Sequence, residues 1–311
     1  MQLILNTTKF VEIFIECDDF FKELEKFMDA QSLPAPENKT RNRERKMSRS
    51  EMMAIIIYYH YSGFRCFKWY YNLVIKKIYS SYFPDAFSYN RFILLMSELN
   101  FPMMFFMTAC RLSFPTGGNY IDAKKLVVSH NRRIKFHKVH KGIASRGKSS
   151  TGWFFGFKLH LIINHLGEIV HFQLSPGNIA DNNHSLLKSI AEKLQCFLFG
   201  DKGYISALAA DLKEKGLHLF TKLRKNMTKK QHLSPEQKYY MKHRGLIETV
   251  FDIMKHTLDI EHSRNRSTKN YFANVLGALI AYTFLDKTPC IPAYVQKMGQ
   301  HDFETALISH I

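Results

Sequence analysis

The sequence predicts an α/β protein in which a mixed sheet flanked by helices follows an all-α N-terminal domain. Three observations support this. Apolar residues recur at helical spacing from residue 9 to about 112, alternation typical of strands begins only after residue 119, and strands and helices alternate from there on. We therefore expect a helical domain at 1–114, a second domain with the sheet at 119–288, and a C-terminal tail at 289–311.

The N-terminal segment is expected to begin with an amphipathic helix. After it comes a basic, proline-containing connector at residues 32–46. Ser48 and Glu51 then form a capping-box pair in front of an apolar run, which predicts the start of a second helix, and Gly63 is expected to end it. The apolar residues that define the first helix are Phe10, Ile13, Phe14, Phe21, Leu24 and Met28.

Two more short helices are expected before residue 112. One covers residues 64–82 and is rich in aromatic residues, for which core packing is favoured over stacking on nucleic-acid bases. The other begins at Ser88 or Asn90 and stops near Pro102. Short helices with tight breaks are typical of a helical bundle, and a helix-turn-helix is one form that such a bundle takes.

A Pro-Gly-rich segment at 115–119 marks the boundary to the second domain. In residues 155–163 apolar and polar side chains alternate as in a half-buried strand, whereas 196–199 is wholly apolar, as in a buried central strand. The pattern predicts, in order, strands at 120–128, 155–163 and 168–175, a helix at 183–194, a strand at 196–199, a helix at 207–215, a strand at 218–223 and a long helix from Glu236.

The charge of the chain favours a polyanionic partner. Its 44 Lys and Arg against 27 Asp and Glu give a formal net charge of +17. The excess is clustered: residues 124–158 hold ten Lys or Arg and no Asp or Glu, and a second basic cluster covers 221–244. One such run is usually a solvated face, but two runs that bracket a carboxylate set indicate a groove for a nucleic-acid backbone.

Other features of the composition indicate a soluble intracellular protein. The five cysteines are odd in number and far apart, which suits neither a disulfide framework nor a zinc site and fits a reducing compartment. The start of the chain lacks the pattern of a signal peptide. The apolar run at 52–61 is much shorter than the roughly 20 residues that a membrane span needs. We expect a cytoplasmic protein that does not act at a membrane.

Two aspartates occupy positions where a sheet commonly carries its chemistry. Asp122 lies inside the first predicted strand, and Asp201 stands at the carboxyl end of the wholly apolar one. Each has an ordinary explanation, because Asp122 could pair with Lys124 or Lys158 and Asp201 could cap the helix that follows. The occurrence of both aspartates in this topology nevertheless favours a functional site, because a carboxylate is costly to bury unless it is paired or bound to a metal.

The predicted last helix carries a third acidic residue. Its apolar face is formed by Ile247, Val250, Met254 and Leu258. Arg244, Glu248 and Lys255 fall within about 40° of one another on the adjoining edge. A solvated Arg–Glu pair is the usual reading of such spacing. Here the cluster borders the core face, which would turn it toward the two aspartates.

This set of residues suits phosphodiester chemistry. Three carboxylates can hold two Mg²⁺ or Mn²⁺ ions, hard cations that prefer oxygen ligands. Two such ions at a spacing of ~4 Å activate the attacking oxygen and stabilise the leaving one. A zinc hydrolase is disfavoured, because the fifteen histidines are scattered and no HExxH or CxxC spacing occurs. His130, His137 and His140 are better explained as neighbours of phosphates.

Four strings in order resemble the DDE transposases of bacterial insertion sequences, in particular the insertion sequence 982 family, a relative of the insertion sequence 4 group. The strings begin at Tyr120, Leu174, Phe199 and Arg244 and read YIDAKKLVVSHNRRIKFHKVHKGIASRGKSSTGWFFGFKLHLIIN, LSPGNIADN, FGDKGYIS and RGLIETVFDIMKH. The resemblance covers nearly the whole chain. It implies a ribonuclease-H-like fold for the sheet domain and recognition of DNA ends by the helical domain.

The resemblance also assigns roles to residues. Asp122, Asp201 and Glu248 would be the acidic triad that binds two Mg²⁺ or Mn²⁺ ions, with Asp122 bridging both. Arg244 and Lys255 would contact DNA phosphates near the reacting bond. The related group often carries a Tyr three residues before the motif Arg, where this chain has Met241, so Tyr240 is not given that role. Asp181, in a loop, is a weaker rival for the triad.

The expected partner is double-stranded DNA, both the terminal inverted repeats of the element and the target. Two coordinated transfers favour a homodimer or a larger assembly on DNA, in the cytoplasm and at the nucleoid of a bacterium. The expected DNA-binding residues are Arg244, Lys255, Arg132, Arg133, Lys135, Lys148, Lys158 and Lys202.

Two other functions share these features. A ribonuclease-H-like nuclease that does not join strands would use the same triad. A non-catalytic DNA-binding protein derived from a transposase would keep the basic clusters, although loss of a triad residue would then be expected and all three are present.

Overall fold

The computed structural model describes residues 5–30, 46–149, 152–205, 209–222, 232–261 and 265–295. Several predicted features lie wholly or partly outside these ranges. They are most of the basic connector, the start of the helix predicted from residue 207, the end of the strand predicted at 218–223, the middle of the second basic cluster, and the C-terminal tail beyond residue 295.

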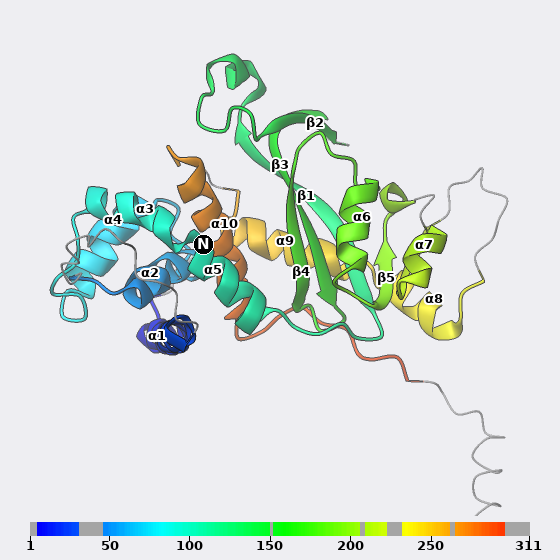
Figure 1. The fold of residues 1–311 in the computed structure, drawn as a ribbon, viewed down its shortest axis with the longest axis horizontal. Helices are drawn as coiled ribbons and strands as arrows, with labels where there is room; N and C mark the ends of the chain where they lie inside the picture. The colour runs from blue at the N-terminus through cyan, green and yellow to red at the C-terminus, as the bar shows by residue number, and fades with distance from the viewer. Residues whose placement is uncertain are drawn as a thin grey trace, which may run out of the picture.

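Before residue 112, all regular secondary structure among the described residues is helical (Figure 1). Ser48 caps α2 as predicted: its Oγ accepts a hydrogen bond from the Glu51 N–H, and Glu51 accepts one from the Ser48 N–H. α2 is buried along almost its whole length, between α1 and α10. The helices are α1 (Thr7–Ala30), α2 (Arg49–Tyr61), α3 (Phe67–Tyr70) with the π-helical η1 (Tyr71–Ile78), α4 (Tyr89–Met96), η2 (Ser97–Leu99), α5 (Asn100–Phe106) and η3 (Met107–Arg111).

The prediction that a helix stops near Pro102 is wrong. Pro102 lies in the first turn of α5, where a backbone N–H has no helical acceptor to lose, so the helical run continues to Arg111. Within the described part of the chain, Tyr89–Arg111 is the one run long and apolar enough to cross a membrane by length and composition, with a mean hydropathy of 1.5. Core helices meet the same criterion, and 44% of its apolar window is buried.

The second half contains the predicted mixed sheet. Its strand order is β2-β3-β1-β5-β6, and β4 also pairs with β3. β1 is antiparallel to β3 and parallel to β5, and β5 is parallel to β6. β2 was not predicted, because its sequence SRGKS carries no apolar alternation. The strands are β1 (Asn119–Ser129), β2 (Ser145–Ser149), β3 (Gly152–Asn164), β4 (Ile169–Pro176), β5 (Cys196–Gly200) and β6 (Leu217–Thr221).

Helices cover both faces of the sheet. One face packs Ile121 and Leu198 against α6 and α7, and the other packs Tyr120 and Phe199 in the large core that also holds α9 and the N-terminal helices. The predicted long helix from Glu236 is two helices, because a turn at residues 243–245 separates α8 from α9. The remaining elements are η4 (Asn131–Phe136), α6 (His184–Ala191), η5 (Lys202–Tyr204), α7 (Ala209–Glu214), α8 (Pro235–Lys242), α9 (Leu246–His256) and α10 (Thr268–Thr283).

α10 joins the two halves of the molecule. It packs against α2 and α5 on one side and contacts α9 on the other, so it lies between the N-terminal helices and the sheet (Figure 1). Twelve of its sixteen residues are buried, which explains why it shows little amphipathic pattern. The core is therefore continuous from α1 to β1, and it holds the sheet at a fixed place relative to the helices.

Candidate active site at the β1–β5 edge

Asp122 and Asp201 stand at adjacent positions on neighbouring parallel strands. β1 and β5 pair through Tyr120 with Phe199 and through Ile121 with Gly200. The next position on each chain is the aspartate, and neighbouring strands lie about 4.8 Å apart. Asp122 is half-buried within β1, whereas Asp201 is exposed where the chain leaves β5 for η5. Asp201 makes no side-chain cap for η5, so the ordinary explanation of a capping residue does not apply.

The environment of Asp122 opposes its negative charge. The pKa of the Asp122 carboxyl is raised to about 6, chiefly by burial and also by the charges of Glu248 and Asp181, against the lowering effect of the Ala123 N–H and Arg244. The alternative pairing with Lys158 does not occur, because Lys158 binds Asp181 at 2.9 Å. Asp122 is thus a partly buried carboxylate that lies among other carboxylates, the electrostatic setting that a bound cation would relieve.

Glu248 reaches this group from the helix that crosses the sheet. α9 packs on β1, and the Lys124 Nζ lies 5.9 Å from the ring centroid of Phe251 on α9. Lys124 and Asp122 are two residues apart on β1 and therefore point to the same face. Phe251 lies three residues after Glu248, so the first turn of α9 carries Glu248 toward Asp122. The predicted apolar face is confirmed for Ile247, Val250 and Met254, which are buried on α9, and Leu258 is also buried but follows the end of this helix.

Arg244 holds Glu248 in place. Its Nη2 donates to Glu248 Oε1 at 2.8 Å, and only 16% of the arginine side chain is exposed. Arg244 lies in the turn before α9 rather than on the helix. The second oxygen of the carboxylate, Glu248 Oε2, is buried and has no partner among the described residues. The Arg–Glu pair therefore does not lie free in solvent, and it leaves one carboxylate oxygen for another ligand.

The structure relates two further residues to this site: Asp181, the weaker rival for the triad, and Tyr204, which the sequence did not single out. Asp181 is fixed by Lys158 Nζ, which also donates to the Ile179 carbonyl at 2.9 Å, and its charge reaches Asp122. Tyr204 is buried, and its hydroxyl has no partner within the described ranges. Burial and the charges of Asp122 and Asp181 raise the pKa of the Tyr204 hydroxyl. Their role depends on tertiary neighbours, so no local pattern indicates it.

The residues of the candidate site have donor atoms that suit a divalent cation, but their side chains are not arranged as a complete metal site. Within the described residues, no three His, Cys, Asp or Glu side chains lie close enough together to hold a metal ion. The donors themselves are suitable, because Mg²⁺ and Mn²⁺ prefer carboxylate oxygens. Glu248 Oε2 is an unpartnered buried oxygen, and Asp122 carries a raised pKa. The negative charge of Glu248 thus acts on Asp122, but the described residues do not form a cluster of three carboxylates.

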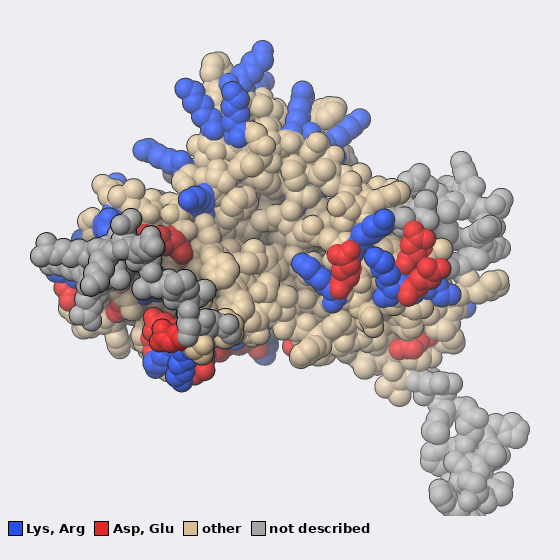
Figure 2. All heavy atoms as spheres, in the orientation of Figure 1, with Lys and Arg blue, Asp and Glu red and all other residues tan. Residues whose placement is uncertain are grey.

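The predicted DNA-binding residues fall into two groups. Three form ion pairs within the protein: Arg244 with Glu248 at 2.8 Å, Lys158 with Asp181 at 2.9 Å, and Lys255 with Glu261 at 3.1 Å. The others are exposed and lie on η4, on β2 or on η5: Arg132, Arg133, Lys135, Lys148 and Lys202. Figure 2 shows Lys and Arg side chains, without Asp or Glu, at the end of the molecule where the β1–β2 connection projects in Figure 1.

We call the segment from residue 130 to residue 154, with the exception of 150–151, the basic arm. It includes η4, β2 and the start of β3, and it contains no acidic residue. Two large aromatic side chains are exposed on it, Phe136 at 81% and Trp153 at 52%. Arg146 lies over the Trp153 ring, 4.7 Å from its centroid. This surface offers both cations and flat rings to a polyanion.

The mixed sheet thus carries Asp122 on β1 and Asp201 directly after the neighbouring β5, and α9, which packs on β1, carries Glu248. The sequence model of the family described as Transposase DDE domain matches residues 112–268. This match covers just over half of the chain, from before β1 to the start of α10, and the chain therefore belongs to the transposase DDE domain family. No curated protein matches the chain significantly.

Proposed function

We propose that this protein is a transposase that cuts DNA at the ends of a bacterial insertion sequence and joins the resulting 3′-OH to target DNA. Its membership of the transposase DDE domain family supports this. The observation that carries the proposal is the position of Asp122 on β1, against which α9 packs, within range of the charge of Glu248 and with its pKa raised by burial. Asp201 directly follows Gly200, the last residue of β5, which pairs with Ile121, the residue before Asp122.

The sheet order also supports a ribonuclease-H-like assignment. Three antiparallel strands, β4, β3 and β1, are followed across the sheet by β5 and β6 parallel to β1, with helices on both faces. In this arrangement the first and fourth core strands are neighbours, and each carries one of the two aspartates. We further propose that the resemblance extends to the insertion sequence 982 family.

Asp122, Asp201 and Glu248 would hold two Mg²⁺ or Mn²⁺ ions, which when bound activate the attacking oxygen and stabilise the leaving one. The other residues position these ligands. Arg244 fixes Glu248 through Oε1 and leaves Oε2 for the site. Lys158 holds Asp181 beside Asp122, where the added negative charge favours a cation. The exposed lysines and arginines of the basic arm would bind the DNA backbone, and a dimer or larger assembly would bring two ends together.

A joining assay separates this function from the two alternatives. Purified protein is incubated with Mg²⁺ or Mn²⁺, labelled duplex carrying the element end, and plasmid target. We expect both nicking and covalent joining of the end by the wild type, and neither by Asp122→Ala, Asp201→Ala or Glu248→Ala, each of which still binds the duplex. Nicking without joining would support the nuclease, and binding without either reaction would support the non-catalytic DNA-binding protein.

A further inference from the structure

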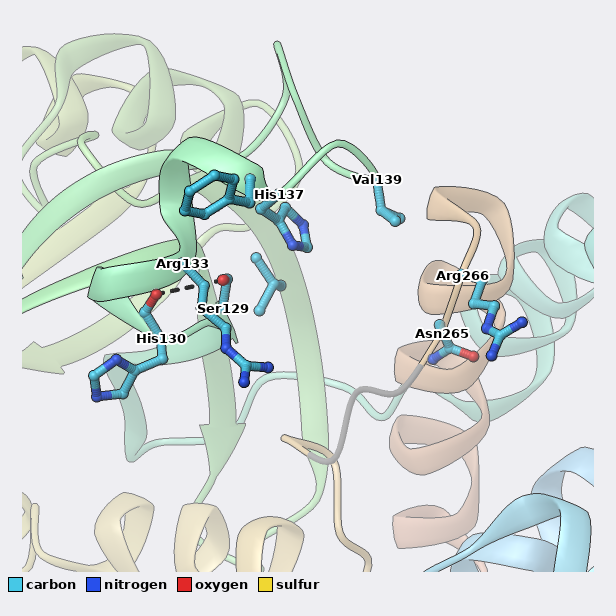
Figure 3. Close-up of a pocket in the computed structure, with 9 residues that line it drawn as sticks. Ser129, His130, Arg133, His137, Val139, Asn265 and Arg266 are labelled. Atoms are coloured by element: carbon cyan, nitrogen blue, oxygen red, sulfur yellow. Dashed lines mark hydrogen bonds between the residues drawn. The ribbon is translucent and has the colours of Figure 1, made fainter.

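A pocket lies at the base of the basic arm, away from the carboxylates. It has a volume of about 670 Å³ and separates η4 from the segment that precedes α10. In Figure 3, His130, Arg133 and His137 form one wall, and Asn265 and Arg266 stand opposite. We call it the arm pocket; its lining residues are Val128, Ser129, His130, Arg133, Phe136, His137, Val139, Asn265 and Arg266.

The lining of the arm pocket is cationic and aromatic. It contains two arginines and two histidines and no acidic residue. Phe136 stands at the end of η4 with 81% of its surface exposed. His137, which stacks on His140, keeps an Nε2 that is buried without a partner in the described part of the chain. The pocket thus combines a flat apolar ring with positive charge.

This chemistry fits an unpaired nucleotide better than duplex DNA. In a duplex the faces of the bases are stacked on one another and cannot reach a protein ring, whereas an unpaired base can stack on an exposed aromatic side chain while cations bind its phosphates. The volume lies within the range of about 300–1,000 Å³ that is usual for pockets that enclose a small ligand. Arg133 and Arg266 stand on opposite walls, so both can reach phosphates of one bound strand.

The position of the pocket relates it to the carboxylates. Val128 and Ser129 line it at the far end of β1, six and seven residues after Asp122. A strand rises about 3.3 Å per residue, which places the pocket roughly 20 Å from Asp122. That separation corresponds to about six base pairs of duplex. DNA that lies at the carboxylates can therefore extend to the arm pocket.

We propose that the arm pocket binds an unpaired nucleotide of the bound DNA, with Phe136 stacked on its base and Arg133 and Arg266 on its phosphates. This inference deepens the proposed function and rests on it for the identity of the polymer. It adds that the DNA is held locally unpaired about six base pairs from the reacting bond.

Binding of two fluorescent probes at equal salt tests the proposal. One is a duplex with a single-stranded oligothymidine extension of about 12 nucleotides, and the other is the same duplex with blunt ends. The variants are Phe136→Ala, the conservative Phe136→Trp, and Phe114→Ala as a matched control, since Phe114 is 84% exposed and lies outside the arm pocket. Wild type should bind the extended probe about tenfold more tightly than the blunt one.

Phe136→Ala should lose this preference while it keeps its affinity for the blunt duplex, and Phe136→Trp and Phe114→Ala should retain it. Equal affinity of the wild type for the two probes, or an unchanged preference in Phe136→Ala, would overturn the proposal. Nicking by the same preparations is measured separately. Wild-type protein that nicks DNA but shows no binding preference sinks the arm-pocket proposal alone, and wild-type protein that shows the preference but does not nick sinks only the proposed catalytic function.

Discussion

At the scale of single residues, the candidate site holds charged side chains that are partly or largely buried, although charged groups are more stable in water. Asp122 sits in a strand, mostly out of water, and faces other acidic groups. Arg244 is largely buried, and its Nη1 has no partner in the described structure. Such arrangements cost free energy of folding and are typical of functional sites. The cost has a definite dependence on pH.

Replacing Asp122 by Asn is expected to stabilise the metal-free protein above about pH 6. Burial raises the pKa of Asp122 from 3.8 to about 6, so the folded chain binds a proton here more tightly than the unfolded chain. Between these two pKa values the wild type loses stability as the pH rises. Above the higher value the carboxylate is ionised in the folded state, and its full destabilising effect is present. Asn is neutral throughout. The gain at about pH 8 should be up to about 3 kcal/mol.

Thermal unfolding in the presence of a chelator measures this gain. The difference between Asp122→Asn and wild type should shrink as the pH falls and disappear below about pH 4, where the carboxyl is protonated in both states. A variant that is less stable than wild type at about pH 8 would show that Asp122 is held by favourable contacts, and the argument for a cation site at this carboxylate would lose its basis.

At the scale of elements, the site depends on close pairing of β1 with β3, since β1 carries Asp122. Gly156 lies opposite Val127 in this pair. A Cβ at Gly156 would stand 2.0 Å from the Leu126 carbonyl oxygen, a backbone atom that cannot move without opening the sheet. The tight approach of the two strands therefore requires glycine at this position.

Gly156→Ala is expected to lower the free energy of unfolding by about 3 kcal/mol, within the usual range for overpacking. Gly245→Ala is the matched control, because a Cβ there meets no atom within 4 Å and the residue has a helical φ of −58°. Its effect should stay within about 0.5 kcal/mol. Chemical denaturation of both variants measures the difference, and equal stabilities would mean that β1 and β3 are not paired as described.

The elements that follow a simple periodicity were predictable, and the others were not. β3 alternates apolar and polar residues and β5 is wholly apolar, so both strands were found close to their observed bounds. β2 is polar and is held by backbone pairing with β3, which leaves no side-chain pattern. The break between α8 and α9 was missed because His243 carries no breaker signal, although its Nδ1 contacts the Tyr239 carbonyl oxygen at 2.8 Å.

The site was predictable in part for the same reason. Asp122 lies within a predicted strand, Asp201 directly follows a wholly apolar one, and Glu248 borders the apolar face of a helix, so a local pattern indicates each of them. Asp181 and Tyr204 belong to a loop and a short turn, and their proximity to Asp122 arises only when β1, β5 and the connection after β4 come together. The pairing of Lys158 with Asp181 could not be predicted either, since 23 residues separate them.

At the scale of the whole molecule, one core connects the N-terminal helices, the candidate active site and the basic arm. α10 packs on the N-terminal helices and contacts α9, which carries Glu248, and α9 packs on β1, which carries Asp122 and leads to the basic arm. A net charge of +17 surrounds this frame with a field that attracts DNA. The account therefore requires that Glu248, from a helix distant in sequence, acts together with the two aspartates of the sheet.

The most direct test compares two acidic residues of the same helix. Asp252 lies one turn after Glu248 on α9 and is exposed. Nicking of element-end duplex in Mg²⁺ is measured for Glu248→Gln and Asp252→Asn, with duplex affinity measured in parallel. We expect Glu248→Gln to reduce the nicking rate at least about 10³-fold with unchanged affinity, and Asp252→Asn to leave both within about twofold. Near-normal nicking by Glu248→Gln would contradict the assignment of α9 to the active site.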